Sequence, residues 1–267
     1  MGDQNRKIVV TGNWKMYKTN DEAVEFVRAL IPQVAELPEQ IQVQLAVPFT
    51  AIQSVSEVAL GSSIIIGAQN MHDVTEGAFT GEIGAKMLRE AGARFVLLGH
   101  SERRQIFHES SSFINKKVKR ALDEGLQPIL CVGETLSERE AEKTQEVIAS
   151  QLQESLMGLT APQAEKLVLA YEPVWAIGTD KIATPVEAQE AHLICRKEIE
   201  ALFGEAVASQ IIIQYGGSVQ AKYVQELLQQ TDIDGFLVGR ASLGLESFIG
   251  IIQAASVGLH AGNSNSH

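Results

Sequence analysis

The chain of 267 residues is predicted to fold as an α/β protein, a (β/α)8 barrel of eight parallel strands with surrounding helices. Two observations lead to this prediction. Short runs of β-branched and other apolar residues recur eight times along the chain, and helical patterns lie between them. One strand–helix unit therefore takes about 33 residues, a length that suits parallel strands joined by helical crossovers. Eight such strands can close into a barrel that leaves no exposed sheet edge.

The predicted strands are short and apolar. They are Ile8–Thr11, Val43–Val47, Ile64–Ala68, Phe95–Leu98, Pro128–Val132, Leu167–Tyr171, Ile211–Tyr215 and Gly235–Val238. Three helices have recognisable beginnings, because Thr19, Ser137 and Thr184 each stand three residues before a glutamate, as in a capping box. Pro185 would take the first helical position after Thr184. A last helix is expected over Leu245–Ala255.

The units are expected to form a single barrel domain over residues 1–257. Residues 258–267, which contain Gly, Ser, Asn and His, are expected to be a frayed C-terminal tail. The alternative fold is an open, doubly wound sheet with a dinucleotide site. That fold would carry a GxGxxG turn after its first strand, whereas residues 11–15 read TGNWK. The barrel is therefore favoured.

The composition is that of an ordinary globular protein, with 45% hydrophobic residues and a formal net charge of −11. The negative charge argues against nucleic acid or an anionic membrane as a partner. No apolar run approaches the length of a membrane span, and the polar start of the chain lacks a secretory segment. The two cysteines, Cys131 and Cys195, suit a reducing cytoplasm, and both are expected to be packing residues. The six histidines show no metal-ligand spacing.

Polar residues and glycines gather at the carboxyl ends of the predicted strands, where a (β/α)8 barrel places its active site. They are Asn13, Lys15, Gln69, Asn70, His100, Ser101, Glu102, Glu134, Glu172, Gly216, Gly217, Ser218, Gly239 and Arg240.

Glu172 directly follows a buried strand, so its carboxylate is expected at the mouth of the barrel. Residues 174–177 read VWAI, which is unusually apolar for a solvated loop. This segment is interpreted as a lid that closes over the carboxylate and excludes water, stiffened by Pro173 and Trp175. The alternative is a buried turn with a surface glutamate.

Three other features suggest chemistry on an anionic substrate. His100 is a candidate acid or electrophile, and a helix that starts directly after it would favour the neutral imidazole. Lys15 could supply positive charge that a net acidic protein lacks. The glycines after the seventh and eighth strands could bring backbone N–H groups close to a phosphate. The alternatives are a structural histidine, a solvated lysine and ordinary turns. The segment GHSER at 99–103 imitates a hydrolase GxSxG motif, but it has Arg103 at the second glycine, and this barrel is the wrong scaffold.

Five stretches can be compared with known families. They read NWKM at 13–16, GAFTGE at 77–82, GHSERR at 99–104, AYEPVWAIGT at 170–179 and YGGS at 215–218. Together they closely resemble the triosephosphate isomerase family, in the family's order, from about Ile8 to Ala255. The resemblance implies interconversion of dihydroxyacetone phosphate and D-glyceraldehyde 3-phosphate through an enediolate, in glycolysis and gluconeogenesis. It implies no cofactor and no metal.

The resemblance also implies roles for single residues. Glu172 would be the general base, and His100 the neutral electrophile, which is the pairing for which this enzyme family is the standard example. Asn13 and Lys15 would bind substrate, with Lys15 stabilising the developing negative charge. The backbone amides that would hold the phosphate are those of Gly178, Ser218, Gly239 and Arg240. Ser101, Glu102 and Thr80 would support the site, Thr80 by reaching the neighbouring subunit of a homodimer.

The chain departs from the family pattern at three positions. Asp180 replaces a usual glycine and Ile182 a usual threonine, both at the carboxyl-terminal hinge of the lid. A changed closing rate or lid equilibrium is therefore expected. Arg240 replaces a common glycine, which would cost about 1 kcal/mol if the backbone there were left-handed.

Two rival functions remain to be compared with the isomerase. Another phosphate-binding barrel, such as a metal-dependent sugar-phosphate epimerase or an aldolase, should show a His and Asp cluster at the strand ends or a lysine inside a strand. Neither pattern is visible. A non-catalytic barrel used for binding or as a scaffold should have lost a catalytic residue, but Lys15, His100 and Glu172 are all present. The isomerase is therefore favoured.

Overall fold

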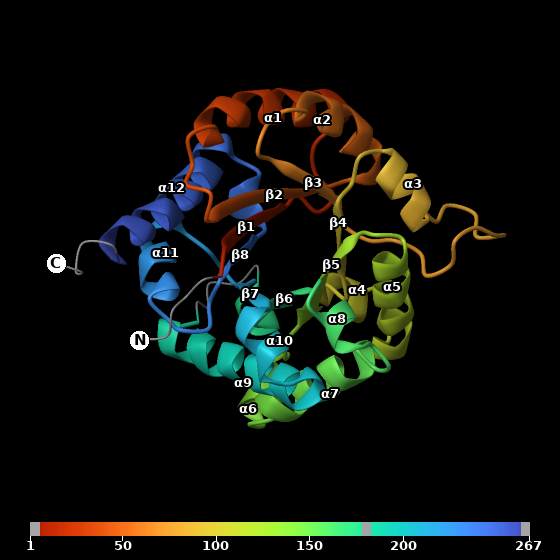
Figure 1. Cartoon of the computed structure of the whole chain (residues 1–267), viewed down its shortest axis with the longest axis vertical. Coiled ribbons are helices and arrows are strands. Elements are labelled where there is room, and N and C mark those ends of the chain that lie inside the picture. Colours follow the sequence, from red (N-terminus) through yellow and green to blue (C-terminus); the bar gives the residue numbers. More distant parts are fainter. Residues whose placement is uncertain (1–5, 178–182, 263–267) are drawn as a thin grey trace.

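The computed structural model describes residues 6–177 and 183–262, the last five of these by their backbone only. Its strands form one closed barrel in which each strand pairs in parallel with its neighbours in chain order, and β8 pairs with β1 to close the ring (Figure 1). The predicted (β/α)8 barrel is confirmed, and the open doubly wound sheet was the wrong alternative.

The strand bounds lie within a few residues of the predicted ones. They are β1 Ile8–Asn13, β2 Ile41–Val47, β3 Ile65–Ala68, β4 Phe95–Leu98, β5 Gln127–Val132, β6 Val168–Tyr171, β7 Ile212–Tyr215 and β8 Gly235–Val238. The first strand is longer than predicted, because Gly12 and Asn13 pair with Leu45 and Ala46 of β2. Asn13 therefore sits in the sheet and not in the loop after it.

Helices surround the barrel on all sides (Figure 1). They are α1 Asn20–Val34, α2 Ile52–Val58, α3 Ala85–Glu90, α4 Ser101–Gln105, α5 Ser111–Asp123, α6 Leu136–Glu140, α7 Thr144–Ser155, α8 Ala161–Ala164, α9 Pro185–Phe203, α10 Glu205–Gln210, α11 Ala221–Leu228 and α12 Leu245–Gly262. Short 3-10 turns are η1 Phe49–Ala51, η2 Val174–Ala176 and η3 Arg240–Ser242.

Two of the three predicted helix starts are confirmed. Thr19 caps α1 and Thr184 caps α9, each with a complete capping box. The prediction for Ser137 was wrong, because α6 begins earlier and Thr135 caps it. Thr135 accepts a hydrogen bond from the Glu138 backbone, and the Glu138 carboxylate accepts one from the Thr135 N–H. The last helix, α12, continues past its predicted end into the segment expected as a tail.

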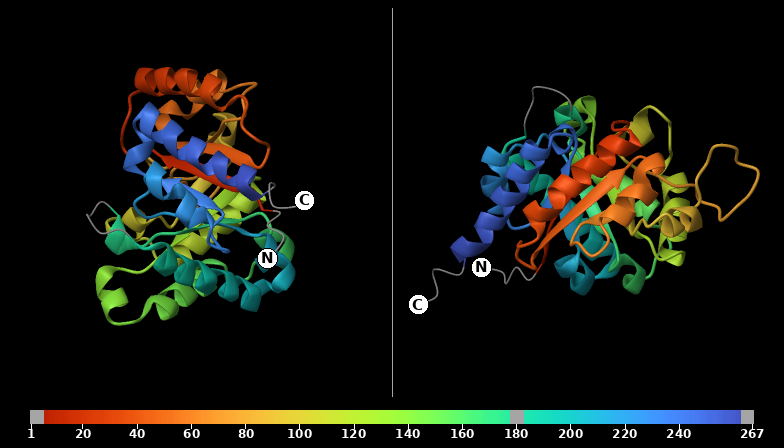
Figure 2. Two further views of the ribbon diagram at one scale, coloured as in Figure 1. Left: turned by 90° about the vertical axis from the view of Figure 1, so that its left-hand side faces the viewer. Right: turned by 90° about the horizontal axis from the view of Figure 1, so that it is seen from above.

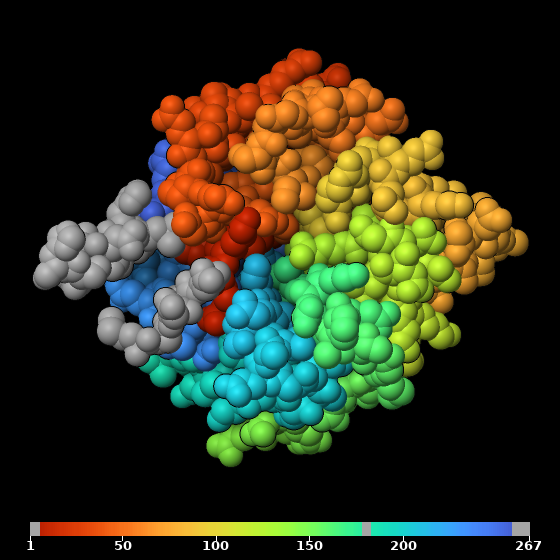
Figure 3. All heavy atoms as spheres, viewed as in Figure 1, coloured from red at the N-terminus to blue at the C-terminus, as the bar shows by residue number. Residues whose placement is uncertain are grey.

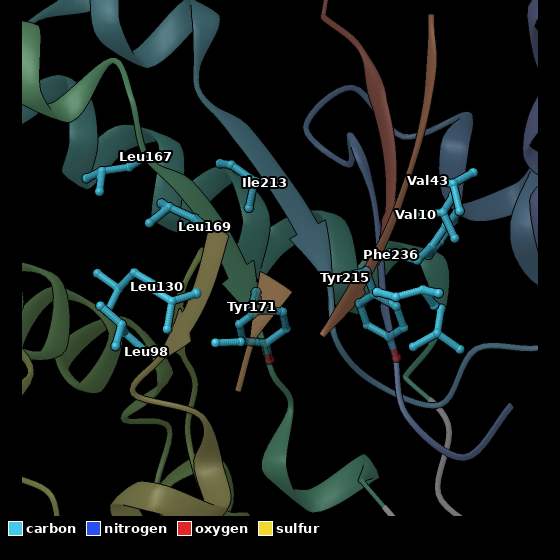
Figure 4. Packing of buried hydrophobic residues seen from close by; sticks show 14 of the residues in the cluster. Val10, Val43, Leu98, Leu130, Leu167, Leu169, Tyr171, Ile213, Tyr215 and Phe236 are labelled. Atoms are coloured by element: carbon cyan, nitrogen blue, oxygen red, sulfur yellow. The ribbon is translucent and has the colours of Figure 1, made fainter. Parts of the chain in front are cut away.

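The buried apolar side chains form two clusters. The larger lies between the strands and the helices, and Figure 4 shows its strand residues, among them Leu98, Leu130 and Ile213. The smaller consists of strand residues such as Phe95 and Cys131, as expected for a filled barrel interior. The prediction that both cysteines are core residues is confirmed, since Cys195 is buried in the outer cluster.

One loop stands out from the rounded body of the molecule. The segment between β3 and α3 projects sideways, as both Figure 2 and the space-filling view in Figure 3 show. Thr80 and Phe79 are exposed on it, and 46% of the Phe79 surface is accessible. Within residues 6–177 and 183–262, no helix combines the length and hydropathy needed to cross a membrane.

Candidate active site

A cleft of about 530 Å³ opens at the carboxyl ends of the strands. Most of the sequence-predicted site residues line it, although they come from distant parts of the chain. They are Asn13, Lys15, His100, Glu102, Glu172, Ser218, Gly239 and Arg240. Ser101 joins them through a hydrogen bond to Glu172. Thr80 does not line the cleft of its own chain, and Gly178, Asp180 and Ile182 lie outside the described residues.

Glu172 lies at the centre of this cleft and is only 2% exposed. Its carboxylate is held by two neighbouring residues at the end of β4. Oε2 accepts a hydrogen bond of 2.8 Å from the Ser101 backbone N–H, and Oε1 lies 3.0 Å from Nε2 of His100. The strand that ends before Glu172 and the turn that begins α4 therefore meet through this carboxylate.

His100 is held as a neutral imidazole by the start of α4. Its Nδ1 accepts a hydrogen bond of 3.2 Å from the Glu102 backbone N–H, so this nitrogen carries a lone pair and no proton. We assign the proton to Nε2 from this network, which makes Nε2 the donor toward Glu172. The sequence-based expectation of a neutral histidine at a helix start agrees with this arrangement.

The surroundings of Glu172 keep its carboxyl group ionised. Burial alone raises its pKa, but His100, the Ser101 N–H and the nearby Lys15 charge act in the opposite direction and outweigh burial. The net pKa of Glu172 is lowered from its ordinary value. A buried carboxylate that stays charged at neutral pH can accept a proton.

Lys15 brings a positive charge to the cleft on a strained piece of backbone. Its φ is +52°, a left-handed conformation that costs about 1 kcal/mol in a residue other than glycine. The Asn13 side chain accepts a hydrogen bond of 3.0 Å from the Lys15 N–H, and the Gln69 amide donates one of 2.8 Å to the Lys15 carbonyl. Nζ pairs with Glu102 at 2.6 Å. Strain of this kind persists where neighbouring contacts hold the backbone in place.

The turns after β7 and β8, which are rich in glycine, line another part of the cleft. Gly216, Gly217 and Ser218 follow β7, and Gly239 and Arg240 follow β8. A Cβ on Gly239 would lie 3.6 Å from Cε of Lys15, so the lysine stem passes directly over this turn. Arg240 is absent from the described residues with positive φ, so the predicted cost of a side chain there does not arise.

The first part of the lid is anchored to a residue to which sequence reasoning gave no role. Glu134 is completely buried, and it accepts hydrogen bonds from the Tyr171 hydroxyl at 3.0 Å and from Nε1 of Trp175 at 2.9 Å. Arg139 lies 3.3 Å from the same carboxylate and stacks on the Trp175 ring. The signal available in the sequence was the position of Glu134 just after β5, directly following Gly133.

Gly133 lets the backbone of Glu172 pass very close to the end of β5. A Cβ at this position would lie 1.8 Å from the Glu172 carbonyl oxygen and 2.7 Å from its carbonyl carbon. Gly133→Ala is therefore expected to lower the free energy of unfolding by about 3 kcal/mol. If the Glu172 carboxylate is the base, as the sequence predicts, the same change should displace it and reduce kcat by about 100-fold. Thermal unfolding and steady-state kinetics would measure both effects.

Gly250→Ala on α12 is the matched control. Its Cβ would meet Ala221 Cβ at an ordinary 3.6 Å, so stability and kcat should stay close to those of the wild type. If Gly133→Ala were as stable and as active as Gly250→Ala, the close approach of the Glu172 backbone to Gly133 would be contradicted.

The arrangement combines a buried carboxylate, an imidazole, a lysine and turns rich in glycine in one cleft. Such a set can move a proton next to a carbonyl group and stabilise the oxyanion that results. Within the described part of the chain, no group of three or more His, Cys, Asp or Glu side chains is placed to hold a metal ion.

The chain matches a known protein family over most of its length. The sequence model of a family described as triosephosphate isomerase matches residues 8–255. A protein named triosephosphate isomerase from Protochlamydia amoebophila is 56% identical, over 95% of this chain and 95% of its own length. Relatives of the same name from Fusobacterium nucleatum and Carboxydothermus hydrogenoformans are 48% and 50% identical over 94% of this chain. The matched regions span 100% and 99% of the length of these two relatives.

Proposed function

Because the chain belongs to the triosephosphate isomerase family, we propose that it interconverts dihydroxyacetone phosphate and D-glyceraldehyde 3-phosphate through an enediolate. The observation that supports this proposal best is the contact between the buried carboxylate of Glu172 and the neutral imidazole of His100. A carbon-bound proton next to a carbonyl needs a base close to the carbon and a donor close to the oxygen, and this pair supplies both.

Substrate binding must break the contact between these two side chains. The single proton on Nε2 of His100 points to Glu172 in the free protein, and the same proton would polarise the substrate carbonyl. When the carbonyl oxygen takes the place of Oε1, the carboxylate loses one donor and becomes a stronger base. The Ser101 N–H still holds the other carboxylate oxygen. Substrate binding would thus activate the base.

Proton transfer then follows from the positions of these groups. Glu172 takes the proton from C1 of dihydroxyacetone phosphate, and the electron pair of that C–H bond forms the C1–C2 double bond of the enediolate. His100 donates to the oxygen on C2, and Lys15 compensates the negative charge, with Asn13 holding the lysine backbone. Glu172 returns its proton to C2. His100 gives its Nε2 proton to the oxygen on C2 and takes the hydroxyl proton from O1 in exchange, which gives the aldehyde and restores the neutral imidazole.

The glycine-rich turns would hold the phosphate. We assign this role to the backbone amides of Ser218, Gly239 and Arg240, with Gly178 contributing from the lid. Small residues allow backbone N–H groups to approach the phosphate oxygens. Closure of the lid would exclude water, and this matters because an exposed enediolate phosphate can eliminate phosphate.

Three further proposals concern the state of the protein. We propose one catalytic domain over residues 1–257, a homodimer and a cytoplasmic location. The projecting loop with the exposed Phe79 supports the dimer, as do the large side chains of Met16 and Tyr17, which are 94% and 58% exposed next to the cleft. In such a dimer Thr80 would approach the site of the partner.

The direct test of the function is conversion of dihydroxyacetone phosphate in deuterated water. We expect formation of D-glyceraldehyde 3-phosphate with deuterium at C2, because a base that takes a proton from carbon can exchange it with solvent. Nuclear magnetic resonance measures both the product and the label. Absence of conversion in correctly folded protein would refute the proposal.

A further inference from the structure

Arg104 joins two strand ends next to Glu172. Its Nε donates to the Gly99 carbonyl at 2.8 Å, and its Nη2 donates to the Cys131 carbonyl of β5 at 3.1 Å. Nη1 donates to the Ser111 hydroxyl at 3.0 Å. Gly99 immediately precedes His100, so one guanidinium group connects the turn that carries the proposed electrophile to the neighbouring strand.

The guanidinium group has no carboxylate partner. Within residues 6–177 and 183–262, no Asp or Glu oxygen lies within 4.0 Å of it, and its acceptors are two carbonyls and a hydroxyl. The residue is partly exposed as a whole, yet burial of the guanidinium lowers the pKa of Arg104. An arginine stays protonated even so. Its charge therefore acts in a weakly screening environment.

Arg104 and Glu172 line a small cavity of about 180 Å³ that is separate from the cleft at the strand ends, which Glu172 also lines. Ser101 and Gly133 line the same cavity, so the space is bounded by the groups that position Glu172. Arg104 and Glu172 thus border one shared space without forming an ion pair, and Glu138 borders the same space.

The other ionisable groups around Glu172 are neutral or are paired with a group of opposite charge. His100 is neutral, and Lys15 is paired with Glu102 at 2.6 Å. From β5, the thiol of Cys131 stays protonated, because burial raises its pKa well above the ordinary value. Just beyond, Glu134 lies within 3.3 Å of Arg139. Two further carboxylates lie near Arg104, but Glu138 accepts a hydrogen bond from Thr135 and Glu109 pairs with Arg103 and Lys117. Among these cations, Arg104 alone has no carboxylate oxygen within 4.0 Å in the described chain.

We propose that Arg104 is a positioning residue for the base. Its guanidinium holds the turn before His100 against β5, and its positive charge, which no ion pair engages in the described chain, keeps Glu172 ionised between turnovers. This inference rests on the proposed role of Glu172.

The test compares variants that separate charge from hydrogen bonding. Arg104→Gln keeps N–H donors and loses the charge, whereas Arg104→Lys keeps the charge with fewer fixed donors. The measured quantity is kcat/KM for deuterium exchange into D-glyceraldehyde, followed from pH 4 to 8. This truncated substrate lacks the phosphate, so only ionisable groups of the enzyme determine how kcat/KM depends on pH.

In Arg104→Gln we expect the acidic midpoint of this profile to rise by about 0.5–1 pH unit, because the ionised base loses a stabilising charge. In Arg104→Lys the midpoint should stay within about 0.2 pH unit of the wild type. Arg94→Gln is the matched control. Arg94 also donates to backbone carbonyls, those of Gly92 and Ala93, but it precedes β4 at the opposite end of the barrel. The acidic midpoint of the kcat/KM profile of Arg94→Gln should stay at the wild-type value.

A second pair of variants keeps the test decisive if Arg104→Gln fails to fold. Ser111→Asp places a carboxylate next to Nη1, and it sits at the first residue of α5, where a negative charge favours the helix. It should cancel the arginine charge and raise the acidic midpoint, whereas Ser111→Asn should not.

An unchanged midpoint in Arg104→Gln, or in Ser111→Asp where the former does not fold, overturns the inference. The proposed function is judged separately: active wild-type protein with an inactive Glu172→Gln variant would support it whatever Arg104 does.

Discussion

Glu172→Gln is expected to reduce kcat by at least about 10³-fold while the barrel stays folded. The amide has nearly the same shape as the carboxylate, and its oxygen can still accept the hydrogen bond from the Ser101 N–H. It cannot accept a proton from carbon at neutral pH. Steady-state conversion of D-glyceraldehyde 3-phosphate would measure the loss, and thermal unfolding would show that the fold is intact.

Glu172→Asp is the matched variant for the same position. It keeps the charge and the base but draws the carboxylate back by one methylene, about 1 Å or more from its working position. A loss of about 100-fold is expected, because proton transfer depends on contact between the reacting atoms. If Glu172→Gln turned over at a rate similar to Glu172→Asp, the carboxylate would not be the base.

Lys15→Met is expected to lower kcat/KM by about 10²–10⁴-fold, and this is the second large effect. The substrate phosphate and the enediolate both carry negative charge, and the protein as a whole is acidic, with a net charge of −11. Loss of a charged partner in a desolvated cleft costs about 3–5 kcal/mol, and each 1.4 kcal/mol is a factor of ten. Both KM and kcat should change, since the charge develops further in the transition state.

Lys18→Met is the control for this prediction. Lys18 lies in the same loop and also has a positive φ, but its Nζ donates to the Leu243 carbonyl and packs over Trp14 and Phe26. It does not line the cleft. Its replacement should affect stability more than KM. Equal losses of kcat/KM in both variants would mean that general surface charge, and not the position of Lys15, attracts the substrate.

Prediction from the sequence succeeded where a local signal was strong. The strands were found because parallel strands buried on both faces are apolar throughout, and β4 and β8 have the predicted bounds. The cap of α6 was misplaced because Thr135 and Ser137 are two equally suitable residues in one short stretch. The hydrogen bond between Thr135 and Glu138 decided between them.

Contacts across the barrel could not be predicted in the same way. Glu134, Gln69 and Arg104 were polar residues at strand ends or in a turn, with nothing in their neighbours to distinguish them. Their contacts across the barrel join residues far apart in the chain: Gln69 binds Lys15, Arg104 binds Cys131, and Glu134 binds Tyr171, at separations of 54, 27 and 37 residues. Such pairs exist only after the strands have closed into a ring.

The sequence by itself determined the barrel, the end of the barrel that carries the chemistry, and the identity of Glu172, His100 and Lys15 as candidates. It could do so because strand periodicity and strand ends are local properties of the chain. Only the tertiary structure decided which ring nitrogen of His100 carries the proton, what holds Lys15 in a left-handed conformation, and which cation near Glu172 has no ion-pair partner among the described residues. Those properties depend on distances between segments remote in sequence, and hydrogen bonds and charges act through such distances.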